Sequence, residues 1–556
     1  MSEESKQVSA QPAKETKAQK SERLKVEKNP WDAWDEVCEF ARQGRASVLP
    51  EWAHFYFKWW GIYTQGDGVG AVGGVGGEGK ESEFFMMRIA IPNGIANTAQ
   101  LRTIAKLTRD HARGICDITT RQCIQMHWLT IESLPEILNE LTKVGLTPKG
   151  ACGDVVRNVT GSPLAGVDPE ELIDGSALAK RLAKLLGGNN EFFNLPRKFK
   201  ISVTGSPSWD NYPEINDIGL TPAVRTANGK REVGYSLRVG GGLSREPHIA
   251  VKLNCFLTEE QAVKAVMAVA EVFREQIGLR QSRTQARMKY LFLKEGWTAE
   301  KFLAEVEKKL GFKLDPAGEE PVPNDVYRDH AGINPQKQPG LSYVGASVLR
   351  GRLTADQVAR VADLVEQYGS GEARFTVQQN FIVVNVPNAK AAELAAKLKE
   401  IGIEVQGSVF FRGTVACTGT EFCKLAITET KGFAKWLVEE MEELLPSFDQ
   451  PLHINVTGCP NNCGQAWIAD IGLEGKKVKI DGAMQDAYFF AVGGALGQHA
   501  GFARQINYRA AVRDVPAAIE RLLSAYLKDR KKDENLRSYF ARTSDESLRA
   551  IAGGAA

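Results

Sequence analysis

Two stretches of the chain carry the same order of apolar and polar runs. DITTRQCIQMHWL aligns with RFTVQQNFIVVNV at an offset of 257 positions, so that Gln122 falls on Gln379. Upstream, FFMMRIAIPNGIANTAQLRTIAKL aligns at the same offset with LSYVGASVLRGRLTADQVARVADL. Alternating apolar positions predict strands, and apolar positions three to four apart predict helices. Each copy therefore predicts strand, helix, strand and a second helix, over 134–144 in one copy and 389–401 in the other.

A second unit repeats at an offset of 253 positions. KISVTGSPSWDNYPEINDIGL aligns with HINVTGCPNNCGQAWIADIGL, and Ser206 stands where the second copy has Cys459. Since the two kinds of unit alternate, the chain has the order A, B, A′, B′. The fold class is therefore α+β, a tandem duplication with pseudo-twofold symmetry. The proline-rich and charged run DPAGEEPVPND predicts a linker between the halves.

These patterns divide the chain into eight segments. We expect a disordered tail over 1–28, a lead-in with a glycine-rich loop over 29–80, a first half-domain over 81–148, an αβ domain on the substrate side over 149–314, a linker over 315–337, a second half-domain over 338–408, a cysteine-bearing αβ domain over 409–545 and a C-terminal tail over 546–556.

Length and charge narrow the class of protein. A chain of 556 residues is too long for one core and predicts several domains. Its net charge of +2 argues against a nucleic acid as the main partner. No run of about twenty apolar residues is present, so we expect no membrane span. The first 28 residues lack the apolar middle of a secretory signal, which favours a cytoplasmic, reducing location.

Four of the nine cysteines fall into two closely spaced pairs. Cys417 and Cys423 form C-x5-C in ACTGTEFCKLA, and Cys459 and Cys463 form C-x3-C in GCPNNCGQ. Thiolates in fours bind either one tetrahedral zinc ion or an iron-sulfur cluster. The C-x5-C spacing is unusual for zinc, and buried free thiols are the third alternative. We favour a cluster.

At these residues the chain resembles the siroheme-dependent nitrite and sulfite reductases. The resemblance extends from about residue 50 to 545 and implies ferredoxin-like half-domains joined to two siroheme and 4Fe-4S αβ units. It also implies that the four cysteines hold a 4Fe-4S cluster, and that Cys463 joins this cluster to the siroheme iron. A non-catalytic zinc or iron-sulfur protein is the alternative from a different class.

The resemblance also assigns a set of basic residues. Four cations match the positions that would surround an anionic substrate above the siroheme iron: Arg121, Arg157, Lys198 and Lys200. A buried oxyanion needs such partners, because an unpaired charge is costly to bury. Siroheme itself has eight carboxylates, and the residues expected to contact it are Arg88, Gln122, Arg283, Arg287 and Lys289.

The substrate is harder to choose than the cofactor. Gln465, which follows the last cysteine and glycine, resembles the nitrite enzymes, whereas Lys200 in KFK resembles the sulfite enzymes. We favour assimilatory reduction of nitrite to ammonium, with sulfite reduction as the alternative. No flavin or nicotinamide motif is present, so the resemblance implies ferredoxin as electron donor. The internal duplication favours a monomer.

One further motif has no assigned chemistry. Residues 66–80, GDGVGAVGGVGGEGK, match phosphate-binding fingerprints, but Glu81 replaces the Ser or Thr that a P-loop requires after its lysine. We interpret this run as a flexible insertion. Cys152, five residues before Arg157, is expected near the pocket as a small packed residue.

Overall fold

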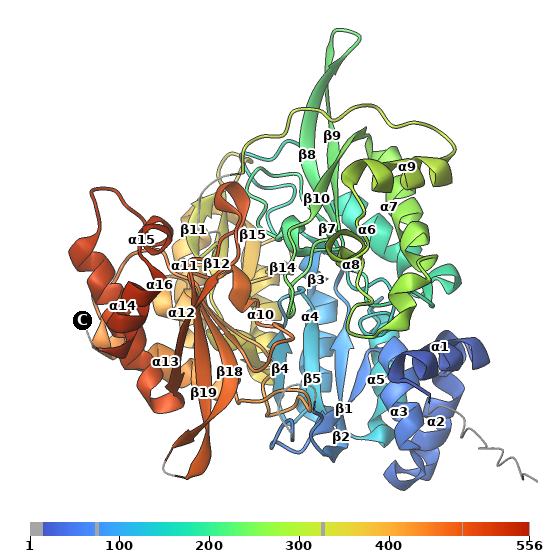
Figure 1. Cartoon of the computed structure of the whole chain (residues 1–556), viewed down its shortest axis with the longest axis horizontal. Helices are drawn as coiled ribbons and strands as arrows, with labels where there is room; N and C mark the ends of the chain where they lie inside the picture. The colour runs from blue at the N-terminus through green and yellow to red at the C-terminus, as the bar shows by residue number, and fades with distance from the viewer. Residues whose placement is uncertain (1–14, 73–76, 324–328, 481, 555–556) are drawn as a thin grey trace, which may run out of the picture.

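The two halves of the chain form four five-stranded sheets, as the duplication predicts (Figure 1). The computed structural model describes residues 15–72, 77–323, 329–480 and 482–554. Repeated segments form the same kind of element. Helix α4 (Thr98–His111) corresponds to α10 (Ala355–Tyr368) at an offset of 257 positions, and strand β8 (Ile218–Ala227) corresponds to β18 (Ile471–Ile480) at an offset of 253. The predicted α+β tandem duplication is therefore confirmed.

The two half-domains exchange a strand. One sheet has the order β1-β2-β5-β4-β13, and the other has the order β11-β12-β15-β14-β3. Strand β13 comes from the second half but pairs antiparallel with β4, while β3 from the first half pairs with β14. The strands are β1 (Ile62–Gly66), β2 (Glu81–Ile89), β3 (Ile95–Asn97), β4 (Ile115–Ile118), β5 (Ile124–Leu129), β11 (Gly332–Pro335), β12 (Leu341–Ala346), β13 (Arg352–Thr354), β14 (Glu372–Phe375) and β15 (Phe381–Pro387).

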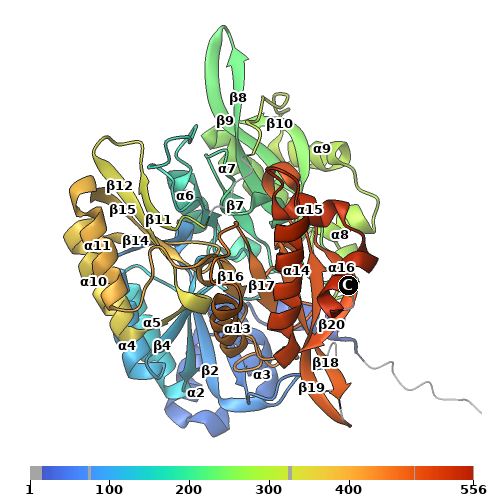
Figure 2. The same ribbon diagram turned by 90° about the vertical axis from the view of Figure 1, so that its left-hand side faces the viewer.

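The exchange places α4 and α10 side by side (Figure 2). Both helices begin with a capping box, Asn97 with Gln100 and Thr354 with Gln357, which satisfies the first free backbone N–H groups of each helix. Helices α5 (Leu134–Lys143) and α11 (Asn388–Glu400) complete the two half-domains. One continuous apolar core runs through both of them, so neither half-domain is independent of the other.

Each αβ unit contains a mixed sheet with three parallel strands and one long hairpin. In the first unit β6 (Thr160–Gly161), β7 (Ile201–Val203) and β8 are parallel, followed by β9 (Lys230–Val239) and β10 (Val251–Leu257). In the second unit β16 (Thr414–Ala416), β17 (Ile454–Thr457) and β18 are parallel, followed by β19 (Ala483–Val492) and β20 (Arg504–Ala511). The hairpins β8–β9 and β18–β19 project from opposite ends of the molecule (Figure 1).

The other helices cover these sheets and the lead-in. Each αβ unit has its own apolar core, formed between its sheet and its helices. The helices are α1 (Lys17–Glu27), α2 (Trp34–Gln43), α3 (Pro50–Phe55), α6 (Ser176–Leu186), α7 (Glu259–Arg274), α8 (Lys289–Leu293), α9 (Ala299–Leu310), α12 (Val409–Gly413), α13 (Lys431–Leu444), α14 (Val515–Asp529), α15 (Leu536–Arg542) and α16 (Asp545–Gly553).

Both predicted tails are wrong where the structure describes them. Residues 17–27 form α1, because Lys25 is buried and its Nζ donates to the carbonyl of Leu195 at 2.9 Å and pairs with Asp154 at 3.1 Å. At the other end, α16 packs through Leu548 and Ala552, both fully buried. A long-range ion pair and two apolar anchors order segments whose composition indicated disorder; residues 1–14 lie outside the described chain.

The glycine-rich run also differs from its prediction. Its described legs, Gly66–Val72 and Gly77–Lys80, make backbone hydrogen bonds with residues 422–426 of the second half. A flexible insertion is therefore wrong for these residues, because the partner lies about 350 positions away and leaves no local trace. Residues 73–76 of the same run lie outside the described chain.

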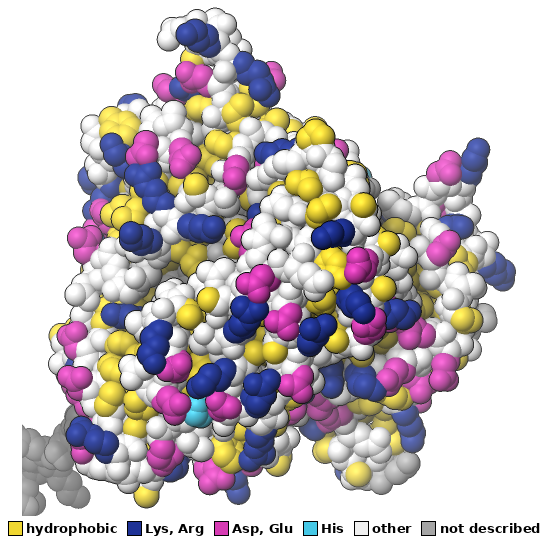
Figure 3. Space-filling view, turned by 180° about the vertical axis from the view of Figure 1, so that it is seen from behind, with side chains coloured by type: hydrophobic (Ala, Val, Ile, Leu, Met, Phe, Trp, Pro, Cys, Tyr) yellow, Lys and Arg dark blue, Asp and Glu magenta, His cyan; other side chains and the backbone are white. Residues whose placement is uncertain are grey.

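The surface agrees with the near-neutral charge. On the face in Figure 3, basic and acidic side chains are interspersed, and no field of one sign covers it. Among the described residues, no helix is long and apolar enough to cross a bilayer.

Candidate active site

The two cysteine pairs lie at the carboxyl ends of adjacent parallel strands. Cys417 directly follows β16, and Cys459 follows β17 after one glycine. Ala416 pairs in register with Val456. Because the carboxyl ends of parallel strands share one edge of a sheet, the loops after them meet. This register brings together cysteines that are about forty residues apart in the chain.

The thiols act on one another electrostatically. Burial raises the pKa of Cys423 to about 12, and the neighbouring Cys463 and Cys417 contribute to this shift. Burial likewise raises the pKa of Cys459, where Cys463 and Cys417 are the next causes. The N–H of Gly458 donates to Sγ of Cys417 at 3.2 Å. Backbone donors of this kind stabilise thiolate ligands.

The arrangement does not fit a single metal ion. Within the described ranges, no three His, Cys, Asp or Glu side chains are grouped at the spacing that one ion needs. A zinc site requires four ligands around one centre, whereas a 4Fe-4S cluster takes one thiolate at each iron and keeps the sulfurs further apart. Four mutually interacting thiols from two loops fit the cluster.

The four predicted substrate cations converge at the amino ends of the corresponding strands in the first half. Arg157 precedes β6, and Lys198 and Lys200 precede β7. Arg121 reaches them from the loop between β4 and β5, where its Nη1 donates to Asn216 at 2.8 Å and its Nη2 to the carbonyl of Asn158 at 2.6 Å. Its Nε is buried, and no described residue accepts a hydrogen bond from it.

The two lysines lie among other cations. Burial lowers the pKa of Lys198 to about 7; Cys463 opposes this shift, and Arg287, Arg197 and Arg157 contribute to it. Burial also lowers the pKa of Lys200, together with Arg287, Arg121 and Lys198. Over the part of the chain that the structure describes, neither ammonium group has a hydrogen bond or ion pair. Such crowding is stabilised by a bound anion.

The cations of one half meet the cysteines of the other. Cys463 is among the charges that raise the pKa of Lys198 and of Arg88. Oγ1 of Thr120, next to Arg121, donates to the carbonyl of Cys463 at 3.3 Å. Cys463 is exposed, whereas Cys459 is buried. The most accessible of the four thiols therefore faces the cationic group.

The residues predicted to hold siroheme divide into two groups. Arg88 lies near Cys463; its Nη1 donates to Sγ of Cys152 at 3.1 Å and its Nη2 to Oε1 of Gln125 at 2.9 Å. Arg287 pairs with Asp217 at 2.8 Å, and Arg283 pairs with Asp154 at 2.5 Å. Arg287 is among the charges that lower the pKa of Arg121 and of both lysines, so it belongs to the cationic group.

Two predicted siroheme contacts have other partners. The Gln122 side chain is fully buried, donates to the carbonyls of Gly161 and Phe375 and accepts from the N–H of Gly161. Nζ of Lys289 donates to the carbonyls of Leu243 and Glu246. Both side chains hold loops of the protein. Burial, followed by Arg287, lowers the pKa of Lys289 to about 8, so Lys289 also lies beside the cationic group.

Several residues near the cationic group were not predicted from the sequence. Tyr63 hydrogen-bonds Cys152, and burial with this contact raises the pKa of Tyr63 to about 12. Lys58 lies near Arg197 and Asp154, and burial lowers its pKa to about 8. Both belong to the lead-in, whose aromatic composition gave no indication of a site. The position of Cys152 beside Arg88 also gives this thiol a polar contact that a packed residue would not have.

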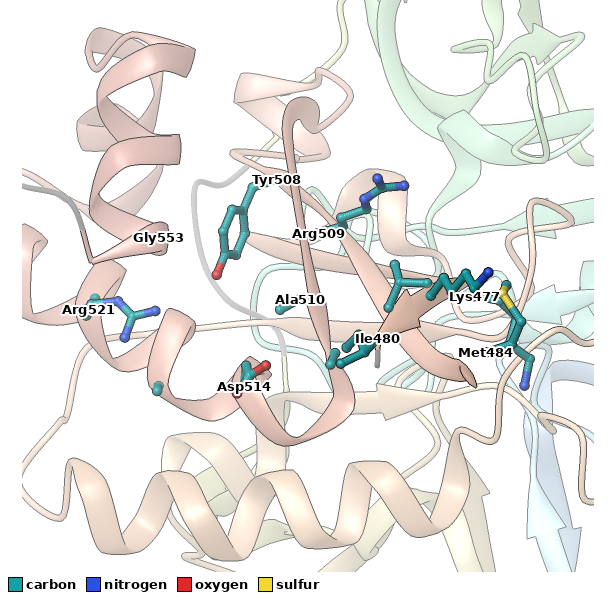
Figure 4. A pocket seen from close by; sticks show the side chains of 13 residues that line it. Lys477, Ile480, Met484, Tyr508, Arg509, Ala510, Asp514, Arg521 and Gly553 are labelled. Carbon is teal, nitrogen blue, oxygen red and sulfur yellow. The ribbon is translucent and has the colours of Figure 1, made fainter. Parts of the chain in front are cut away.

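A separate surface cavity of about 720 Å³ lies between strands β18 and β20 and helices α14 and α16. Its lining includes Lys477, Tyr508, Arg509 and Arg521 (Figure 4). Neighbouring residues Tyr508 and Arg509 leave β20 in opposite directions. The lining contains none of the four paired cysteines and none of the four cations, so this cavity is not the candidate site.

Comparison with known proteins settles the family. The model for the nitrite and sulphite reductase 4Fe-4S domain matches residues 152–314 and 409–553, and the model for the nitrite/sulfite reductase ferredoxin-like half domain matches 78–144 and 334–401. The chain belongs to the nitrite and sulfite reductase family. Membership confirms the resemblance, the ferredoxin-like half-domains and the predicted cofactors, siroheme and a 4Fe-4S cluster.

Individual relatives carry both substrate names. The assimilatory ferredoxin-dependent nitrite reductase of Haloferax mediterranei is 38% identical and covers 91% of this chain and 88% of its own length. The sulfite reductase [ferredoxin] 2 of Mycolicibacterium paratuberculosis is 36% identical and covers 92% of each chain. The structure of the Mycobacterium tuberculosis NirA protein matches with a TM-score of 0.88 at 33% identity, over 95% of this chain and 97% of its own.

Proposed function

We propose that this reductase converts nitrite to ammonium with six electrons supplied by ferredoxin. The observation that carries the proposal is the convergence of Arg121, Arg157, Lys198 and Lys200 from the first half with Cys463 from the second. Nitrite nitrogen passes from +3 to −3, so six electrons and several protons must reach one bound ion. A site that holds the ion firmly prevents the loss of partly reduced intermediates.

The four cysteines are the proposed ligands of the cluster. Cys417 and Cys423 come from the loop after β16, and Cys459 and Cys463 come from the loop after β17. We assign Cys463 as the thiol that would link the cluster to the siroheme iron. It is the exposed thiol of the four, and it is among the charges that raise the pKa of Lys198 and of Arg88. The cofactors supply the redox chemistry when bound, and the protein supplies orientation and charge.

The cations have distinct proposed roles. Arg121 is held by Asn216 and by the carbonyls of Asn158 and Ile201, so its guanidinium is fixed before the anion arrives. Arg157 is held in the same way by the carbonyls of Ala151 and Gly153. Preorganised donors of this kind stabilise charge without reorganisation.

The two lysines are proposed proton donors as well as anion partners. A group serves best as a general acid when its pKa lies near the working pH. Burial and the neighbouring arginines lower the pKa of Lys198 to about 7, which meets this condition. Asp217 fixes Lys200 by accepting from its backbone N–H at 2.9 Å.

Arg88 and Arg283 are the proposed partners of the siroheme carboxylates, and Arg287 supports the same side of the site. Arg283 shares Asp154 with Lys25 and Arg197. Three cations around one carboxylate leave net positive charge, which favours an anionic cofactor. Gln122 and Lys289 are proposed to act through the loops that they hold.

Sulfite is the second candidate substrate, and Lys200 favours it. Lys200 and Gln465 line the same small internal cavity, which also includes Arg121 and Tyr212. Sulfite carries a larger negative charge than nitrite once deprotonated, so an additional ammonium group suits it better. Sulfite reduction to sulfide also takes six electrons, from +4 to −2.

Steady-state turnover of both anions tests the proposal. The purified holoenzyme is assayed with reduced ferredoxin, and kcat/KM is measured for nitrite and for sulfite. We expect a higher value for nitrite. A sulfite value well above the nitrite value would replace the proposed substrate, and absence of turnover with both anions would overturn the proposed function.

A further inference from the structure

The glycine-rich run packs against the first cysteine loop. We call its described legs, Gly66–Val72 and Gly77–Lys80, the glycine clasp. The N–H of Gly66 donates to the carbonyl of Phe422 at 2.9 Å, that of Gly79 to Lys424 at 2.8 Å and that of Ala71 to Ala426 at 2.7 Å. The two legs of the clasp therefore donate to alternate carbonyls on both sides of Cys423.

The two legs also hold each other. The N–H of Asp67 donates to the carbonyl of Lys80 at 3.2 Å. At the base of the second leg, Nζ of Lys424 pairs with Oε1 of Glu81 at 2.8 Å. The clasp is thus anchored on strands β1 and β2 of the first half, while the cysteine loop belongs to the second half.

The close approach explains why two positions of the clasp are glycine. A Cβ on Gly70 would lie 2.4 Å from Cγ2 of Thr420 and 2.6 Å from the carbonyl oxygen of Ala426. A Cβ on Gly79 would lie 2.2 Å from the carbonyl oxygen of Gly70. These distances are shorter than atoms tolerate, so any side chain at either position forces the backbones apart.

The underlying loop also makes backbone hydrogen bonds of its own. Within the loop, the N–H of Cys423 donates to the carbonyl of Gly419 at 3.0 Å, and that of Ala426 donates to Cys423 at 3.1 Å. Leu425, between two clasped carbonyls, is 43% exposed. Without the clasp, the carbonyls of residues 422, 424 and 426 would face water, and the loop that carries Cys423 would open more readily.

We propose that the glycine clasp is a positioning element for the iron-sulfur cluster, which holds the Cys423 loop closed and limits access of water to the outer side of the cluster. The inference rests on the proposed cluster ligands. It assigns a structural reason to a motif that resembles a phosphate-binding loop, and it makes cluster retention depend on the first half of the chain.

Gly79→Ala in the holoenzyme tests the clasp, because Gly79 requires no left-handed backbone and the substitution adds only bulk. Two quantities are measured: the rate at which a ferrous chelator removes cluster iron, followed by the loss of labile sulfide, and amide hydrogen exchange at residues 422–426. We expect both rates to rise about 5- to 10-fold, since one or two net backbone hydrogen bonds are lost. Glu78→Ala, at an exposed site on the same leg, is the matched control and should match wild type.

Lys424→Met provides a second variant that adds no bulk to the clasp. It removes the ion pair with Glu81 and should raise both the rate of iron removal and the rate of amide exchange about 2-fold. This variant therefore tests the clasp even if Gly79→Ala does not accumulate. Unchanged rates of iron removal and amide exchange in the folded variants would contradict the proposed role of the glycine clasp. A wild-type protein that is purified without an iron-sulfur cluster would instead overturn the proposed function, so the two failures are distinguishable.

Discussion

Lys200 and His453 occupy equivalent positions in the two halves of this reductase. The two positions are related by the 253-residue repeat. Each backbone N–H donates to an equivalent aspartate: Lys200 to Asp217 at 2.9 Å and His453 to Asp470 at 2.7 Å. Lys200 lies in the cationic group, where burial and then Arg287, Arg121 and Lys198 lower its pKa. Burial, followed by Arg537 and Arg412, lowers the pKa of His453 to about 3, so this side chain is neutral.

The choice of substrate is expected to depend on Lys200. Lys200→Asn removes one ammonium group from the site, and the ratio of kcat/KM for nitrite over sulfite should rise about 10-fold, which corresponds to one charge-assisted contact of about 1.4 kcal/mol. Steady-state assays with both anions provide the measurement. His453→Asn, at the equivalent position, is the control. An unaltered ratio in Lys200→Asn would show that Lys200 does not set selectivity.

The arginines are expected to stabilise the bound anion. Arg121→Ala and Arg157→Ala should each lower kcat/KM for nitrite about 10- to 100-fold, the loss expected for a charge-assisted hydrogen bond. Arg412, which precedes β16 as Arg157 precedes β6 and pairs with Asp329 at 3.0 Å, is the matched control. If Arg412→Ala lowers activity as much as Arg157→Ala, the cationic group is not the substrate site.

Cys463 is expected to couple the two cofactors. Cys463→Ser should lower turnover at least about 100-fold and shift the visible bands of siroheme, because a ligand of the iron is changed. The absorption spectrum and the iron content of the purified variant are measured together. Cys38→Ser, at a thiol in the lead-in helix α2, should leave both unchanged. A wild-type spectrum in Cys463→Ser would exclude the link.

The strand exchange is expected to depend on Asp117. This buried carboxylate on β4 pairs with Arg352 of the exchanged strand β13 at 2.9 Å, and Arg352 also donates to Glu421 in the first cysteine loop. Asp117→Asn should lower the free energy of unfolding by about 3–5 kcal/mol, because a buried ion pair is broken on one side. Thermal unfolding at pH 7 measures the loss. Asp356→Asn, which removes an exposed pair with Arg109 between α4 and α10, should cost less than about 1 kcal/mol.

The same carboxylate predicts a pH dependence. Burial would raise the pKa of Asp117, but Lys431, His127 and Arg352 outweigh burial and hold its pKa well below the ordinary value. The unfolded chain therefore binds the proton first, so the stability contributed by Asp117 is complete above about pH 5 and decreases as the pH falls through 4. The difference in unfolding temperature between wild type and Asp117→Asn should narrow from pH 6 to pH 4. A constant difference would contradict the assigned charge.

The duplication, the α+β class and the cluster-type cysteines could be inferred from the chain itself, because each is local. Periodicity reports strands and helices within a few residues, and the two repeats report equivalent units wherever they lie. The C-x5-C and C-x3-C spacing likewise depends on short loops. The four cations were found only through family resemblance, since Arg121 and Lys200 share no spacing that would indicate a common site.

Long-range contacts decided the remainder. The exchange of β3 and β13, the docking of α1 through Lys25 and the clasp on residues 422–426 each join segments far apart in the chain. Their free energy comes from burial, ion pairs and backbone hydrogen bonds that exist only once the halves have packed, and composition contains no record of such partners. For this reason the described residues of the polar tail and of the glycine run, whose composition indicates disorder, are ordered beside the site.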